Sequence, residues 1–385
     1  MNFLNRLCML LLLALACNRG AAEPIVPTRD DEVVEVLPGL GASRLEERRA
    51  RRVLAQRPGD PALAVATGRR YLARAHEQGD PRFAGQALAV IAGWSDAQAP
   101  DDVLLLRADL QQYLHQFDAS VQSLQVLVAR PSGARQSQAW LTLATVRRVQ
   151  GRYADSDIAC RQVAALGVAL HGAACLAENA ALRGEFDPAR AQLASLLARP
   201  GLPPVTQAWL LVTQAELEQR AGRNAAADTA FRAALAAQPD SYARLAYADF
   251  LIDQKRPAEA LPWLKDEARS DAVLLRLAIA GRRAGTPEAG RDASEMRQRI
   301  TLANQRPEAR LFHGREQAMF ALWIETDPQR ALALARDNAA HQREPLDLLM
   351  FARAAQASGN AAAVQEARRL ASEIGLDDRR VDAPV

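Results

Sequence analysis

Histidines are the side chains of this chain that could most readily bind a metal or carry protons near neutral pH. No two of them stand at metal-ligand spacing: His76, His115, His171, His313 and His341. The HExxH, GxSxG and GxxxxGK[ST] patterns are all absent. Acidic residues are numerous but scattered along arginine-rich segments, where ion pairs one helical turn apart account for them. We therefore expect no catalytic residue, no metal site and no cofactor, and we do not expect an enzyme.

Two cysteines, Cys160 and Cys175, flank a predicted turn at Leu166-Gly167 almost symmetrically. If two antiparallel helices meet at this turn, one cysteine lies late in the first helix and the other early in the second. Their Cα atoms could then approach the roughly 5.5–6 Å that a disulfide requires. An oxidising compartment would permit the bond. The alternative is two small core residues with free thiols, with Cys175 facing the opposite side of its helix.

Helices must position these side chains, because the composition favours helix throughout. Hydrophobic residues form 49% of the 385 residues but aromatic residues only 5%, so alanine and leucine supply most of the apolar surface. Both are strong helix formers. Runs of β-branched residues with strand length are nearly absent, so we expect no sheet.

Charge is nearly balanced over the chain. The formal net charge is +3, and residues 1–22 contain Arg6 and Arg19 with no acid, so their removal leaves +1. A nucleic-acid-binding protein usually carries a basic excess or stripe. We therefore expect no nucleic-acid partner.

The N-terminus has the features of an export signal. One basic residue precedes the short apolar run Leu7–Ala16, and the small residues Gly20-Ala21-Ala22 stand before Glu23. This order is typical of a secretory signal peptide, 1–22, cleaved before Glu23. A competing lipoprotein processing box, Ala14-Leu15-Ala16-Cys17, would make Cys17 the lipidated residue. Either reading predicts an exported protein, in the periplasm or anchored to a membrane by lipid. No later segment approaches the ~20 apolar residues of a transmembrane helix.

A repeated pattern of small, glycine and aromatic residues organises the rest of the chain. Its clearest copy contains Ala215, Gly222, Ala227, Phe231 and Pro239, with Ala234 one helical turn after the aromatic residue. This pattern resembles the tetratricopeptide repeat, a helix–turn–helix unit of about 34 residues. Glycine suits the left-handed residue that ends the first helix. Ala227 should be buried where the two helices cross.

Other copies follow in phase. The strong ones contain Trp140 to Ser156, Leu176 to Ala189, Leu104 to Leu124 and Phe351 to Ala371, and weaker ones centre on Ala87, Ala260 and Ala331. The small residues early in each second helix mostly recur every 33 to 38 residues: Ala87, Ser120, Ser156, Ala189, Ala227, Ala260, Ala331 and Val364. The longer step after Ala260 leaves room for one degenerate repeat around Leu274–Arg299. We therefore predict an all-α solenoid, a right-handed superhelix of eight to nine repeats.

The expected organisation has four parts. Residues 1–22 form the signal peptide, 23–57 an arm and capping helix, 58–378 the superhelical domain, and 379–385 a C-terminal tail.

The resemblance also implies where ligands bind, because the first helix of each tetratricopeptide pair lines the concave groove. Carrying over this phase predicts the following groove residues: Arg148, Glu178, Trp209, Glu216, Gln219, Asp249, Asp253, Arg276, Arg282 and Arg283, with Trp323 as a further aromatic. We expect an acidic middle and then a basic stretch. The charged side chains should be exposed, so that reversing Glu216, Asp249 and Asp253 to arginine would leave the helices intact. The Lys/Asn/Arg set of carboxylate-clamp repeats is not found.

We therefore expect a non-catalytic scaffold of the bacterial cell envelope that binds a protein or peptide partner in its groove. A structural subunit of an envelope assembly is the alternative. A small-ligand receptor or an enzyme on a helical scaffold is a third reading, which a closed pocket with convergent polar groups would favour.

Overall fold

The computed structural model describes residues 42–130, 135–305 and 314–382. The signal peptide, Cys17 and His313 lie outside these residues. The chain divides into two units, 1–53 and 54–385. Of the first unit the structure describes the beginning of helix α2 (Ala42–Gln56), at the position of the expected capping helix. All that follows concerns the second unit.

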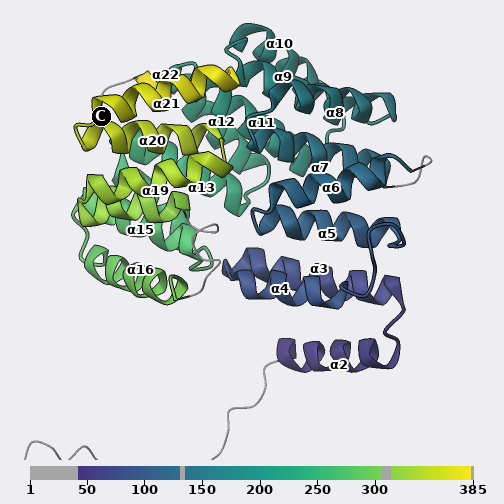
Figure 1. Ribbon diagram of the computed structural model, residues 1–385. Helices are drawn as coiled ribbons and strands as arrows, with labels where there is room; N and C mark the ends of the chain where they lie inside the picture. The colour runs from purple at the N-terminus through teal and green to yellow at the C-terminus, as the bar shows by residue number, and fades with distance from the viewer. Residues whose placement is uncertain (1–41, 131–134, 306–313, 383–385) are drawn as a thin grey trace, which may run out of the picture. The chain divides into compact units, whose positions relative to one another are not determined.

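Antiparallel helix pairs, each packed on the next, build this unit (Figure 1). The first four pairs are α3 (Pro61–Gln78) with α4 (Pro81–Val90), α5 (Asp101–Tyr113) with α6 (Phe117–Val128), α7 (Gln136–Val149) with α8 (Tyr153–Ala165), and α9 (Ala169–Leu182) with α10 (Phe186–Leu197). The next three are α11 (Pro204–Arg220) with α12 (Asn224–Ala237), α13 (Ser241–Asp253) with α14 (Pro257–Leu264), and α15 (Asp271–Ala284) with α16 (Ala289–Ala303). The last two are α18 (Gly314–Phe320), continued by the π-helix η1 (Ala321–Glu325), with α19 (Pro328–His341), and α20 (Pro345–Ala357) with α21 (Ala361–Ile374). The short α22 (Arg379–Asp382) follows.

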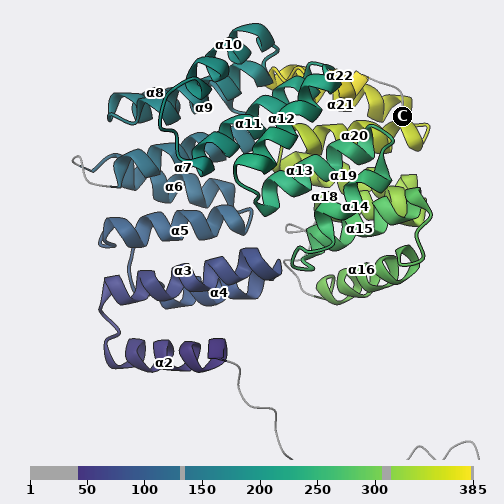
Figure 2. The ribbon, with the colours of Figure 1, turned by 180° about the vertical axis from the view of Figure 1, so that it is seen from behind.

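The nine pairs of the described residues confirm the all-α solenoid, and no strand occurs among these residues. The pair α15–α16 occupies the position of the expected degenerate repeat. Figure 2 shows from behind how α11 to α15 continue the succession of helices that α3 to α10 begin.

The turn between the two helices of each pair contains one residue with a left-handed backbone conformation. Glycine fills this place in six pairs: Gly79, Gly151, Gly184, Gly222, Gly285 and Gly359. His115, Lys255 and Thr326 adopt the same positive φ in the other three. A residue with a Cβ is disfavoured there, so glycine is the usual choice. Two of these three repeats, around Ala260 and Ala331, are weaker copies of the sequence pattern, whereas the third, Leu104 to Leu124, is a strong copy.

Small residues let the two helices of a pair cross closely. Ala144, Ala215 and Ala227 are completely buried, as the repeat pattern predicted. Serine takes the small position in two pairs, and its hydroxyl needs a partner when buried. The Ser120 hydroxyl donates to the Ala108 carbonyl over 2.9 Å, and that of Ser156 donates to the Ala144 carbonyl over 2.8 Å. These bonds tie the second helix of a pair back to the first.

The last pair contacts the middle of the solenoid. The Arg343 amide donates to the Val149 carbonyl and the Asp377 amide to the Leu182 carbonyl, both over 2.8 Å. Arg353 of α20 forms an ion pair with Asp253 of α13, 100 residues earlier in the sequence. The chain end therefore packs across the concave side in this region.

Candidate binding site on the concave side

Two adjoining cavities lie on the concave side. The larger has a volume of about 740 Å³ and lies between α3, α5, α13, α15, α18 and α19. The smaller has a volume of about 330 Å³ and is lined mainly by first helices from α7 to α20. Leu245, Ala272, Arg315 and Glu316 line both. Helices far apart in the sequence therefore line one continuous surface.

The smaller cavity gathers most of the predicted groove residues. Eight of the ten line it: Arg148, Glu178, Glu216, Gln219, Asp249, Asp253, Arg276 and Arg283. Trp323 also lines it. Trp209 instead stacks on His171 with ring centroids 5.5 Å apart, beside the core of the α9–α11 region. Arg282 donates to the Ile324 carbonyl.

The expected exposure of these charges is wrong, because they pair with one another inside the cavity. Arg276 is only 5% exposed and bonds both carboxylate oxygens of Asp249, over 3.0 and 2.8 Å. Arg148 pairs with Glu178 over 3.0 Å. Burial acts to lower the pKa of Arg276, but the Asp249 carboxylate keeps this pKa above its ordinary value. Charge reversal here would place like charges together in a confined space.

Tyr242 and Glu216 form a second polar unit in the smaller cavity. The Tyr242 hydroxyl donates to the Glu216 carboxylate over 2.6 Å. Tyr242 is 64% exposed, and it lines the cavity with Glu216. The charge of Glu216 raises the pKa of Tyr242 well above its ordinary value, and burial raises the pKa of Glu216. The phenol therefore stays a donor at neutral pH.

Arg283 and Trp323 meet in the same cavity. The Arg283 guanidinium lies 5.3 Å from the Trp323 ring centroid and donates to the Ile252 carbonyl over 3.1 Å. Trp323 belongs to the π-helix η1, a distortion that is frequent at functional sites.

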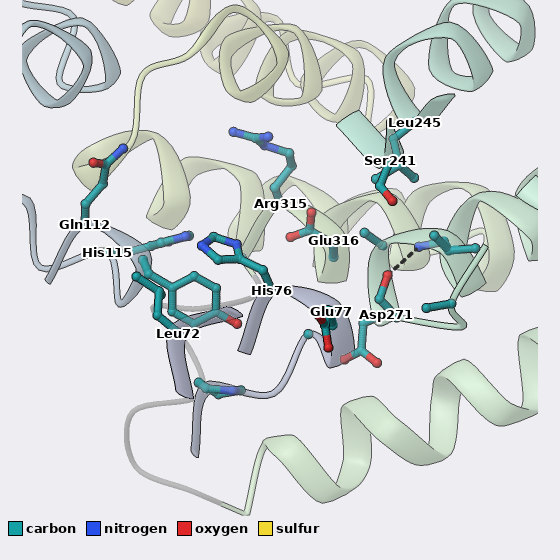
Figure 3. A pocket seen from close by; sticks show the side chains of 18 of the residues that line it. Leu72, His76, Glu77, Gln112, His115, Ser241, Leu245, Asp271, Arg315 and Glu316 are labelled. Atoms are coloured by element: carbon teal, nitrogen blue, oxygen red, sulfur yellow. Dashed lines mark hydrogen bonds between the residues drawn. The ribbon is translucent and has the colours of Figure 1, made fainter. Parts of the chain in front are cut away.

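The larger cavity is acidic. Its carboxylates are those of Glu77, Asp109, Glu267, Asp271 and Glu316, whereas Arg315 is its one lysine or arginine among the described residues. Arg315 already pairs with Asp347 over 2.6 Å and with Glu344. His76 and His115 extend toward the middle of the cavity, opposite Arg315 and Glu316 (Figure 3). Glu267 and Asp271 pair with Arg244 and Arg299, which do not line the cavity. The other acidic side chains of the lining favour a cationic ligand group.

Sequence reasoning missed several residues of these cavities. His115 and Tyr113 belong to a pair whose turn lacks glycine, and a histidine at the turn position where glycine is usual is the signal that could have marked it. Arg353 and Arg220 were missed for different reasons. Arg353 lies in the last pair, whose approach to α13 no local pattern reveals. Arg220 lies at the buried end of α11, directly after the predicted Gln219.

Asp109 links the larger cavity to the pH dependence of stability. Burial raises its pKa from 3.8 to about 6, against the opposing charge of Arg69. The folded chain thus holds this proton more tightly than the unfolded chain. The stabilisation from protonation is complete below about pH 4 and is lost as the pH rises through about 6. Asp109→Asn should therefore make the protein more stable than the parent above about pH 6, by roughly 1–3 kcal/mol, with the difference vanishing near pH 4.

Urea unfolding across this pH range measures the Asp109 effect. Asp118→Asn is the control, because the exposed Asp118 bonds only Gln150 among the described residues. Equal pH profiles for Asp109→Asn and the parent would show that the carboxyl is not perturbed.

Within residues 42–130, 135–305 and 314–382, no group of three or more His, Cys, Asp or Glu is placed so that it could hold a metal ion. In the same ranges, no helix combines the length and apolar character needed to cross a bilayer.

Comparison with known proteins gives no family assignment from sequence. No family model matches the chain, and no curated protein matches it. Similar solved structures include a tetratricopeptide repeat protein from Parabacteroides merdae, with 14% identity over 71% of this chain and 98% of that chain and a TM-score of 0.37. A Rap protein complexed with competence and sporulation factor shows 12% identity over 86% of this chain and 92% of that one, with a TM-score of 0.47. The TPR domain of P58(IPK) shows 14% identity over 86% and 94%, with a TM-score of 0.21.

These scores are low, so the fold assignment rests on the helix pairs themselves. Consecutive antiparallel pairs, left-handed turn residues and small crossing residues define an α-solenoid of tetratricopeptide-like repeats.

Proposed function

We propose that this chain is a non-catalytic scaffold that holds a segment of a partner protein on its concave side. The observation that carries the proposal is the pair of adjoining cavities, which share Arg315 and Glu316 and together extend along first helices from α3 to α20. A peptide segment in extended form can place successive side chains in such adjoining spaces. The charge of the larger cavity selects a basic side chain at one end of the segment.

A photo-crosslinking amino acid at Gln112 tests this function. Gln112 lines the larger cavity, whereas Ile158 on α8 is exposed and lines neither cavity, so position 158 is the matched control. The crosslinker at 112 should capture one discrete protein from the cell envelope, and the crosslinker at 158 should not. Filling the space with Ala272→Trp should abolish the crosslink. Capture at 158 alone would favour a structural subunit that uses its outer surface.

A small-ligand receptor is the second candidate. The volume of the larger cavity falls within the roughly 300–1,000 Å³ of small-molecule sites. Failure of position 112 to capture any protein, together with thermal stabilisation by a low-molecular-weight extract, would favour this candidate.

The cell envelope is the compartment that we propose, from the export signal in residues 1–22 and the cysteine pair at 160 and 175. Mass spectrometry of the mature chain should find Glu23 at its N-terminus. A lipid-modified Cys17 would establish the anchored form instead.

A further inference from the structure

Arg220 is an exception among the arginines that line the smaller cavity. It is the last residue of α11 and is 5% exposed. Its Nε has no acceptor, and the described residues give its guanidinium neither a hydrogen bond nor an ion pair. By contrast, Arg148, Arg276 and Arg353 of the same cavity each pair with a carboxylate.

The two carboxylates that interact electrostatically with Arg220 each accept hydrogen bonds from another side chain. Glu216, one turn earlier on α11, accepts the hydrogen bond of Tyr242. Asp378 accepts two hydrogen bonds from the Arg380 guanidinium, over 2.9 and 2.6 Å. A buried guanidinium that no carboxylate bonds directly is costly in free energy. Glu216 and Asp378 act on Arg220 electrostatically, but neither carboxylate bonds its guanidinium within the described residues.

Neutral donors without partners lie around Arg220. The side-chain amide of Gln219 lines the cavity and makes no hydrogen bond with the described residues. The Tyr153 hydroxyl is buried and also has no partner. Burial raises the pKa of Tyr153, and the charge of Arg220 acts against this rise, which places the phenol within the electrostatic reach of Arg220. Of these groups, Arg220 and Gln219 line the cavity with donors that no acceptor of the described residues bonds, whereas Tyr153 lies in the hydrophobic core.

We propose that the smaller cavity binds the carboxylate of an acidic side chain from the partner segment, with Arg220 as its ionic partner and Gln219 as a second donor. This inference rests on the proposed function and names the chemistry of one end of the segment. A guanidinium bonds a carboxylate through two parallel hydrogen bonds. One unmatched positive charge suits a monoanion better than a doubly charged phosphate. The volume of about 330 Å³ admits a side chain or two but not a folded domain.

Calorimetric titration of the mature chain tests the proposal with a short neutral peptide that carries one central glutamate. The same peptide with glutamine and inorganic phosphate are the comparison probes. The glutamate peptide should bind at least tenfold more tightly than the glutamine peptide, and phosphate should not compete. No preference for glutamate, or equal binding of phosphate, would overturn the proposal.

Stability separates a ligand-binding role of Arg220 from a structural one. Arg220→Met and the neutral Arg220→Gln should abolish the preference for glutamate and raise the melting temperature of the ligand-free protein, because an unpaired buried charge is removed. The exposed Arg369→Gln should change neither property. If both Arg220 variants melt lower and still prefer glutamate, the residue is structural and the proposal fails.

Crosslinking at Gln112 distinguishes this failure from failure of the proposed function. If the partner is still captured while the glutamate preference is absent, the scaffold function survives and the carboxylate site does not. If the parent protein captures nothing at Gln112, the scaffold function itself fails.

Discussion

Asp249→Ala should lower the free energy of unfolding by about 3–5 kcal/mol. The substitution leaves Arg276 buried without the carboxylate that it bonds through two nitrogen atoms. Glu316 approaches Arg276 only to 3.9 Å and compensates in part. Denaturant unfolding of the parent and the variant measures the loss.

A double-mutant cycle identifies the cause of this loss. Asp249→Ala/Arg276→Met should be much less destabilised than Asp249→Ala alone, since no unpaired charge remains. Asp187→Ala is the matched control: Asp187 is 78% exposed and pairs with Arg190 and Arg223, so its loss should cost no more than about 1 kcal/mol. A double variant as unstable as the single one would show that packing, not the unpaired charge, dominates.

Loss of the bridge between Cys160 and Cys175 should cost about 3 kcal/mol. The structure joins these residues across the α8–α9 turn, with Cα atoms 5.7 Å apart and a sequence separation of 15. Gly172 permits the close approach of the two helices, because a Cβ there would lie 2.8 Å from the Cys160 carbonyl oxygen. The cross-link stabilises the fold mainly by restricting the unfolded chain. Cys160→Ala/Cys175→Ala should therefore unfold at a lower denaturant concentration than the oxidised parent.

Alkylation shows whether the bridge exists in the exported protein. Both side chains are buried, so unfolded protein is required for the assay. Without reductant, unfolded parent protein should not be alkylated at these two cysteines, and with reductant it should be alkylated at both. Alkylation at both positions without reductant would contradict the bridge, and the double variant should then match the parent in stability.

Local patterns in the sequence were sufficient to predict the helix pairs. Ala227, Phe231 and Gly222 have roles that depend on neighbours within one repeat, so their spacing predicts their environment. The phase of the repeats also predicted which side chains of α11 and α13 lie on the concave side, and Glu216 and Asp249 do line the smaller cavity.

Local sequence patterns could not predict the closure of the concave side. It depends on a small rotation at each repeat, and these rotations accumulate along the array. The pairing of Arg353 with Asp253 reflects the sum of all rotations between them. The same closure explains why Asp253, which was expected to face solvent, pairs with Arg353, whereas Asp249 pairs with Arg276 of the adjoining repeat.

The bonds from Arg343 to Val149 and from Asp377 to Leu182 have a consequence for the way this array can vary. In an open solenoid each repeat contacts only its neighbours, so units can be gained or lost at the ends and melting can proceed piecewise. Here the ninth pair is joined to the third and fourth, so the pairs from the third to the ninth form a closed ring. Insertion or deletion of one unit within this ring would carry the chain end past its contacts. The number of repeats between these pairs is therefore constrained by geometry, and they should melt in a single transition.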